Sequence, residues 1–249
     1  MDLLVGTSGY SYKEWKGNFY PEDLPEREML RFYGTRLSTV EINNTFYRLP
    51  KESVLKSWGE QVPADFQFAV KASQRITHIK RLKDAGDETE YLLRTIRVLG
   101  LRLGCILFQT PPNLKKDLPR LEQFLKYIPG DTHAAFEFRH SSWFEQDVFD
   151  CLKANRCALC IADADDELVI PFVATADWGY LRLRRVEYSA ADLKKWMKQV
   201  QSQKWDRAFV FFKHEDAGTG PNLAAQFLKL AGVEPKDAGN SSRPGRQST

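Results

Sequence analysis

The sequence has few cysteines. Cys105, Cys151, Cys157 and Cys160 are the four in 249 residues, too few for a disulfide framework in a chain of this length. Cys157 and Cys160 have the Cys-x-x-Cys spacing, but they lie in an apolar run that predicts a strand, where residues three apart point to opposite faces. We therefore expect buried thiols that behave as small hydrophobic side chains.

Histidines are also few, which limits metal chemistry. His78, His133, His140 and His214 show no His-Glu-x-x-His spacing. His133 precedes a predicted strand. It is therefore expected at the N-terminal end of the sheet, where residues contribute to stability, and not at the opposite end, where barrel enzymes place their chemistry. Converging carboxylates can hold a divalent metal, but lysines and arginines at several predicted strand ends would repel one. A divalent metal is therefore an alternative that the sequence does not favour, and the cofactor is left open.

Long apolar runs, signature loops and a strong charge imbalance are absent as well. No run approaches the roughly 18 apolar residues of a membrane span, and the N-terminus lacks the basic start and apolar core of a signal peptide. We therefore expect a cytoplasmic protein with no membrane partner. The absence of a Walker loop and of a Gly-x-Ser-x-Gly elbow disfavours those two chemistries. A net charge of +3 permits an anionic partner but does not argue for one.

Strand-like and helix-like segments alternate along the chain. Strands are predicted over 3–6, 39–43, 66–71, 105–109, 134–139, 157–163, 180–184 and 207–213, and helices near 25 and over 51–61, 89–99, 118–127, 146–154, 189–202 and 221–231. A strand followed by a helix at intervals of roughly 25–40 residues favours a parallel sheet. Eight such units predict an α/β protein with one (β/α)8 TIM-like barrel over 1–234. The segment 164–179 lacks a helical pattern, so an irregular connection is expected in the sixth unit, and 235–249 is expected to be a disordered tail.

The predicted fifth strand has two different faces. Phe136 and Phe138 point one way, whereas Ala135, Glu137 and Arg139 point the other. Charged groups are costly to bury unless they are paired, so the second face is expected to line a polar barrel interior.

The same alternation extends to the other strands. Polar residues near their C-terminal ends are assigned to the interior face: Glu41, Asn43, Lys71, Gln109, Asp163, Arg182 and Lys213. Barrel enzymes place their chemistry at this rim. With Glu137 and Arg139 included, four cations against three carboxylates leave a surplus of one positive charge, which would suit an anionic ligand. The alternative is a self-neutralising network that only fills the barrel.

Loops at the same rim supply further candidate ligand-binding residues. After the strands come Ser8, Tyr10, Trp15, Tyr47, His140 and Trp143. After the eighth strand, His214, Gly218 and Gly220 lead into a helix whose N-terminus could bind phosphate. The alternative for the glycines is a plain turn and helix cap, and for His214 a surface salt bridge with Glu215 or Asp216.

Several motifs in order resemble the YecE-like family, domain of unknown function 72. They are Val5-Gly6-Thr7-Ser8-Gly9-Tyr10 with Trp15 and Phe19-Tyr20-Pro21, Glu41-Ile42-Asn43-Asn44-Thr45-Phe46-Tyr47, Phe68-Ala69-Val70-Lys71, Phe108-Gln109-Thr110-Pro111-Pro112, and Glu137-Phe138-Arg139-His140 with Trp143. The resemblance implies a TIM-like barrel in a bacterial or archaeal cytoplasmic protein, and no established reaction. Its likeness to metal-dependent DNA-repair endonuclease barrels is an analogy of fold. Many members have an Asn pair where this chain has Lys213-His214.

Three hypotheses about function follow. The first is an enzyme or former enzyme that binds a phosphate-bearing ligand, with nucleic acid as the expected class, a phosphorylated small molecule as the other, and hydrolysis as the expected reaction. Arg139, Lys71 and Lys213 would neutralise phosphate, Glu41 and Glu137 would act as acid and base, and Trp15, Tyr47 and Trp143 would stack a base. The second is a glycoside-processing enzyme with Glu41 and Glu137 as paired carboxylates. The third is a non-catalytic binding module. The sequence does not predict the oligomeric state.

Overall fold

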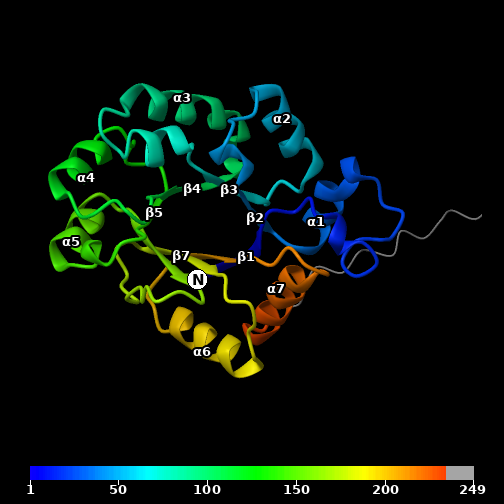
Figure 1. The fold of residues 1–249 in the computed structure, drawn as a ribbon. Helices are drawn as coiled ribbons and strands as arrows, with labels where there is room; N and C mark the ends of the chain where they lie inside the picture. Colours follow the sequence, from blue (N-terminus) through cyan, green and yellow to red (C-terminus); the bar gives the residue numbers. More distant parts are fainter. Residues whose placement is uncertain (234–249) are drawn as a thin grey trace, which may run out of the picture.

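Eight parallel strands form a closed barrel in the computed structural model, which describes residues 1–233 (Figure 1). The strands follow one another around the ring in sequence order: β1 (Asp2–Ser8), β2 (Thr39–Ile42), β3 (Gln67–Lys71), β4 (Leu103–Gln109), β5 (Ala134–Glu137), β6 (Ala158–Asp163), β7 (Trp178–Leu183) and β8 (Arg207–Phe212). The predicted (β/α)8 TIM-like barrel is confirmed. The tail expected over 235–249 lies outside the described residues.

Helices cover the outside of the barrel (Figure 1). They are α1 (Met29–Arg36), α2 (Glu52–Gln61), α3 (Gly86–Ile96), α4 (Leu118–Leu125), α5 (Gln146–Ala154), α6 (Ala190–Gln201) and α7 (Thr219–Leu230). Residues 164–177 connect β6 to β7 without a helix, so the predicted irregularity in the sixth unit is confirmed. Within residues 1–233, no helix has both the length and the apolar character needed to cross a bilayer.

Several boundaries differ from the predictions by a few residues, and the helices α1 and α3 are two examples. The helix expected near Pro25 starts as a 3-10 turn over Glu26–Glu28, and α1 begins only at Met29. The helix expected over 89–99 ends at Ile96, and a 3-10 segment with Gly100 at φ +55° leads into β4. A positive φ is costly for residues other than glycine, so the chain can leave its helical path at this position.

The barrel closes where the first strand pairs with the last. β1 and β8 align from Asp2 opposite Arg207 to Thr7 opposite Phe212. On its other side β1 pairs with β2, and a Cβ at Gly6 would collide with the carbonyl of Thr39. Glycine is therefore needed here for the close approach of the two backbones.

Alternation along the strands separates two apolar layers. One layer fills the barrel and consists of Leu4, Ala69, Cys105, Leu107, Ala135, Ala158, Cys160, Trp178, Tyr180, Phe209 and Phe211. The other packs between the strands and the helices and contains Phe68, Phe108, Phe136 and Phe138. Cys160 and Cys157 lie in different layers and all four cysteines are free, as the strand spacing predicts.

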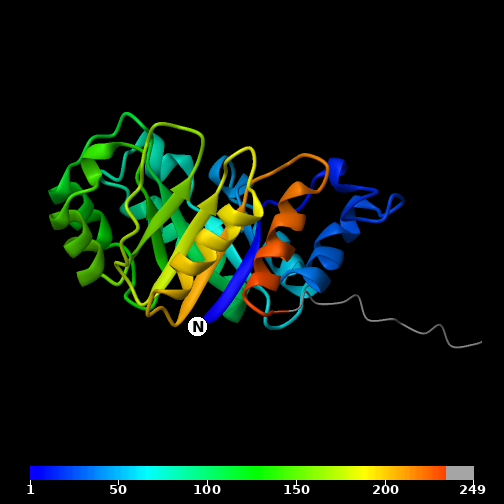
Figure 2. The ribbon, with the colours of Figure 1, turned by 90° about the horizontal axis from the view of Figure 1, so that it is seen from below.

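The polar residues occupy the end of the barrel where the strands finish. In Figure 2 the strands run upward from the N-terminus, and the loops that follow them form the upper rim. The interior layer is apolar in its lower and middle parts. Above it lie the buried polar side chains of Ser8, Glu41, Gln109, Glu137 and Arg182. We call this region the barrel mouth.

Candidate functional site

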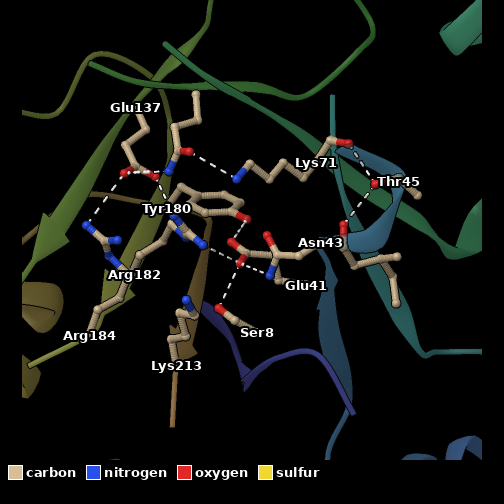
Figure 3. A network of polar contacts seen from close by, with 12 residues as sticks. Ser8, Glu41, Asn43, Thr45, Lys71, Glu137, Tyr180, Arg182, Arg184 and Lys213 are labelled. Atoms are coloured by element: carbon tan, nitrogen blue, oxygen red, sulfur yellow. Dashed lines mark hydrogen bonds and ion pairs between the residues drawn. The ribbon is translucent and has the colours of Figure 1, made fainter. Parts of the chain in front are cut away.

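A buried arginine bridges two buried glutamates at the barrel mouth (Figure 3). Arg182 of β7 places Nη2 2.8 Å from Oε1 of Glu41 on β2, and Nη1 2.6 Å from Oε2 of Glu137 on β5. The three side chains are at most 3% exposed. Because β2, β5 and β7 are separated around the ring, one guanidinium joins distant parts of the barrel across its interior.

Hydrogen bonds satisfy most of the remaining carboxylate oxygens. Glu41 accepts hydrogen bonds from Ser8 Oγ at 2.7 Å, from the Tyr180 hydroxyl at 2.6 Å and from Asn43 Nδ2 at 2.9 Å. Glu137 accepts one from Gln109 Nε2 at 2.9 Å. Buried charges require this combination of an opposite charge and hydrogen bonds.

The network holds both carboxylates in their ionised form. Burial raises the pKa of Glu41, but the Arg182 charge and the hydrogen bonds from Tyr180, Arg182 and Ser8 outweigh burial and keep it below its ordinary value. Burial acts on Glu137 in the same way, and Arg182, Arg184 and Gln109 lower its pKa to about 2. A carboxyl group that is ionised at neutral pH is a poor proton donor. The geometry therefore does not favour a general acid at either position.

Lys71, the last residue of β3, has a different environment. Its Nζ donates to Gln109 Oε1 at 3.0 Å and lies 4.3 Å from the centroid of the Phe46 ring. Burial lowers the pKa of Lys71 to about 8, and the charges of Arg182 and Arg139 act in the same direction, against the carboxylates of Glu41 and Glu137. Within residues 1–233 its hydrogen-bond partner is a neutral amide, and it forms no ion pair.

Three more cationic side chains surround the mouth. Arg139 and Arg184 approach Glu137 Oε1 at 3.8 and 3.7 Å, and Lys213 points toward the network from the end of β8 (Figure 3). Lys213 also forms a 3.9 Å ion pair with Glu215. With Lys71 and Arg182, five cations therefore face the three carboxylates of Glu41, Glu137 and Glu215, which leaves a surplus of two positive charges. This exceeds the surplus of one expected from the sequence.

Asp163 is the charged residue that the sequence places wrongly. Its Oδ2 accepts from Arg185 Nε at 2.9 Å and from Trp196 Nε1 of α6 at 3.1 Å, on the helix side of the barrel wall. Asp163 shares the alternation of Leu159 and Ile161, which pack in the outer layer. A strand turns residues two apart to the same face, so Asp163 points away from the interior.

Two of the three proposed base-stacking residues are packed inside the protein. Trp143 is fully buried, stacks on Phe138 with ring centroids 4.4 Å apart, and donates from Nε1 to the Leu114 carbonyl. Trp15 is fully buried as well and packs against Tyr20. Neither ring is available to a ligand. Tyr47 is 74% exposed and remains available.

The histidines and glycines proposed as ligand-binding residues have local structural roles. His140 Nδ1 accepts from the Ser142 amide, which caps a short turn. His214 is buried, and its Nε2 lies 2.6 Å from the Arg185 carbonyl, so the surface salt bridge considered for it is not formed. Gly218, at φ +78°, precedes α7, and a Cβ at Gly220 would lie 3.0 Å from the His214 carbonyl. A turn and cap accounts for both glycines, and a phosphate site there stays a prediction.

A small cavity adjoins the network. It has a volume of about 220 Å³ and is lined by Gly9, Tyr10, Ser11, Tyr12, Ile42, Asn43 and Asn44. Within the described part of the chain, the buried Oδ1 of Asn43 accepts no hydrogen bond. Asn43 thus lines the cavity and donates to Glu41, and its Oδ1 is an acceptor whose hydrogen bond is unmade within residues 1–233.

Sequence reasoning missed three residues of the mouth. Tyr180 and Arg184 share the alternation of Arg182, so the rule used for the other strands would have found them. His78 packs edge-on against Phe46 at 4.8 Å, and burial together with the charges of Lys71, Arg139 and Arg81 lowers its pKa. His78 lies in the connection between β3 and α3, where the alternation of the strands gives no signal.

The positions of the side chains within the described residues also indicate whether the mouth could bind a metal ion. In the range 1–233 no three His, Cys, Asp or Glu side chains come together as a metal site. The two carboxylates of the mouth are instead bound to Arg182, a cation that occupies the space between them. The residues of this network therefore do not fit a divalent metal.

A closed barrel of eight parallel strands, with buried charged residues where the strands end, defines a TIM-like α/β barrel protein. The family model described as "Protein of unknown function DUF72" matches residues 4–248. The chain belongs to this family, which confirms the YecE-like resemblance.

Relatives and solved structures agree with this assignment. The UPF0759 protein YunF of Bacillus subtilis is 24% identical over 93% of this chain and 95% of its own length. YecE of Escherichia coli is 34% identical over 46% of this chain and 43% of its own. A DUF72 family protein of Thermotoga maritima matches with a TM-score of 0.84 and 29% identity over 93% of this chain and 100% of that chain. An Enterococcus faecalis DUF72 protein, 18% identical with a TM-score of 0.81 over 97% of this chain and 100% of its own, shows the shared fold.

Proposed function

We propose that the barrel mouth binds a phosphate-bearing ligand. The observation that carries this proposal is the surplus of two positive charges at the mouth. Arg182 neutralises half of the combined charge of Glu41 and Glu137. Arg139, Arg184 and Lys213 have carboxylate contacts of 3.7 to 3.9 Å, and Lys71 has none within residues 1–233. A dianionic phosphate would offset the charge of these four side chains.

Unpaired donors at the same place support the proposal. Within residues 1–233 the buried Nε of Arg184 has no hydrogen-bond partner, and neither does the buried Nε of Arg182. A buried donor without a partner costs free energy, which an acceptor oxygen from a ligand would recover. Arginine presents its donors in a planar fork that matches the oxygens of a phosphate.

The ligand class that we propose is a phosphorylated small molecule. Base stacking would need exposed rings, and Trp15 and Trp143 are both buried, which leaves Tyr47. A nucleic-acid strand, the class expected from the sequence, is therefore less well supported than a compound with one phosphate group. Titration with an oligonucleotide beside a mononucleotide distinguishes these two ligand classes.

The geometry gives less support to glycoside processing. That chemistry needs two carboxyl groups with the scissile bond between them, one of them protonated. Here the Arg182 guanidinium lies between Glu41 and Glu137, and both carboxyl groups are held ionised. Hydrolysis assisted by a carboxyl acid is disfavoured for the same reason, so the proposal is one of binding.

Binding can be tested by calorimetric titration with inorganic phosphate, adenosine monophosphate and a single-stranded oligonucleotide at low ionic strength. The variant carries Arg139→Gln with Arg184→Gln, and the matched control is Lys153→Gln, which removes an exposed cation from the last turn of α5. We expect the double variant to bind phosphate about tenfold more weakly and the control to match the wild type, a loss of about 1.4 kcal/mol.

Equal phosphate binding by the wild type and the double variant would overturn the proposal, and so would no binding by the wild type. Thermal melting of each variant checks that it is folded. An oligonucleotide that binds far more tightly than the mononucleotide, with a steep salt dependence, would identify a strand as the ligand.

A further inference from the structure

Lys71 lies at the barrel mouth and forms no ion pair with a carboxylate of the described residues. Its Nζ is held between the Gln109 amide oxygen, at 3.0 Å, and the face of the Phe46 ring, at 4.3 Å. The two carboxylates of the network, those of Glu41 and Glu137, are both bound to Arg182. The amine is thus fixed in position, partly exposed and free of a counter-ion within residues 1–233.

This environment keeps part of the amine unprotonated near neutral pH. Burial and the neighbouring cations lower the pKa of Lys71 from 10.5 to about 8. At pH 7.5 roughly a quarter of the side chain is then neutral, against about a thousandth of an ordinary lysine. A lysine that is desolvated or placed beside other cations is activated as a nucleophile in this way.

We propose that Lys71 forms an imine with a carbonyl group of the ligand. The Nζ lone pair attacks the carbonyl carbon, and the carbonyl oxygen takes up a proton, which gives a carbinolamine. That intermediate loses its hydroxyl group and the remaining proton on nitrogen as water, and a carbon–nitrogen double bond forms. No oxidant or reductant takes part.

The surroundings of Lys71 indicate the class of carbonyl compound. This step rests on the proposed function, because Arg139, Arg184 and Lys213 would hold the phosphate group. Asn43 follows the neighbouring strand β2 and lines the cavity of about 220 Å³, and its Oδ1 has no hydrogen-bond partner within the described residues, so a hydroxyl group of the ligand could donate to it. The substrate class is therefore a phosphorylated hydroxyaldehyde or hydroxyketone.

The test uses pyridoxal 5′-phosphate and pyridoxal as carbonyl probes. Sodium borohydride supplies the hydride that reduces an imine to a stable secondary amine, and peptide mass spectrometry identifies the modified lysines. At pH 7.5 we expect Lys71 to be modified about tenfold faster than the exposed Lys153, because far more of it is neutral. The rate at Lys71 should level off above pH 8, whereas the rate at Lys153 should continue to rise.

Two variants and one competitor make the result specific. Lys71→Arg keeps the charge and should lose the fast modification, whereas Lys153→Arg should retain it. Inorganic phosphate should slow modification of Lys71 by pyridoxal 5′-phosphate. The preference of Lys71 for that probe over pyridoxal should disappear in the Arg139→Gln, Arg184→Gln double variant.

The outcomes separate this inference from the proposed function. Phosphate binding at the mouth together with slow modification of Lys71, no faster than that of Lys153, overturns the imine and leaves the phosphate site in place. Fast modification of Lys71 by both probes alike, with no effect of phosphate, supports the nucleophile and overturns the phosphorylated substrate.

Discussion

At the scale of single residues, the mouth is organised by one charge placed between two opposite charges. Glu41 and Glu137 are buried, and each would be unstable there without Arg182. The same contacts lower the pKa of both carboxyl groups and take them out of proton transfer. Lys71, whose pKa is lowered to about 8, can by contrast change its protonation state near neutral pH.

The pKa of Glu137 predicts how stability changes in acid. Its value is lowered from 4.5 to about 2 in the folded protein. The unfolded chain therefore binds the proton first as the pH falls, so the stabilisation is complete above about 4.5 and is lost between there and about 2. Urea unfolding at a series of pH values should show the free energy of unfolding falling through this window.

Glu137→Gln removes that titrating group. We expect a flatter dependence on pH in the same window, and a lower free energy of unfolding at pH 7 because Arg182 loses one of its two partners. Glu60→Gln, at an exposed carboxyl group of α2, is the matched control and should follow the wild type. If Glu137→Gln has the same slope as the wild type, the assigned role of Glu137 is wrong.

At the scale of elements, each strand delivers its last inward residue to the mouth, and the helices hold the strands in register. The connection after β7 shows how the start of a helix holds the ends of two strands in place. Arg185 binds Asp163 at 2.9 Å and Asp192 of α6 at 3.1 Å. Asp192 also completes the capping box at Ser189, so the start of α6 is tied to the ends of β6 and β7.

Ser189→Ala should therefore destabilise the protein. The Ser189 hydroxyl accepts from the Asp192 amide, and its loss leaves a helix donor without its cap, at a cost of about 1 kcal/mol. Ser202→Ala is the matched control at the other end of α6, where the hydroxyl donates to the Gln199 carbonyl. Urea unfolding should show a clearly smaller loss for Ser202→Ala, and equal losses would contradict the capping argument.

At the scale of the whole molecule, closure of the ring makes distant segments depend on one another. The first and last strands pair directly, and the ring of Phe209 on β8 packs against Gly104 on β4, across the barrel. Trp178, Tyr180 and Phe211 surround the same ring. The interior is thus one packed unit, and the mouth rests on it.

Phe209→Ala should destabilise the entire barrel in one transition. The ring is fully buried, and its removal leaves a cavity that costs about 3–5 kcal/mol. Chemical unfolding followed both by tryptophan fluorescence and by circular dichroism should show coincident curves at lower urea. Tyr91→Ala, at a ring that is 53% exposed, should change stability by no more than about 0.5 kcal/mol. Separate transitions for the two probes would show that the barrel does not unfold as a unit.

The sequence by itself determined the order of the elements and the inward face of most strands. Alternation is a local property, and it correctly placed Glu41, Lys71, Glu137 and Arg182 in the interior. It would also have excluded Asp163 and included Arg184 had the rule been applied to them consistently.

Tertiary structure decided which of these residues meet. The sequence contains no signal that Arg182 binds both Glu41 and Glu137, because those contacts depend on how the ring closes and staggers. Burial of Trp15 and Trp143 was decided in the same way, since a loop aromatic becomes core or surface only when helices pack over it. The charge surplus that the function rests on is therefore a property of the closed barrel.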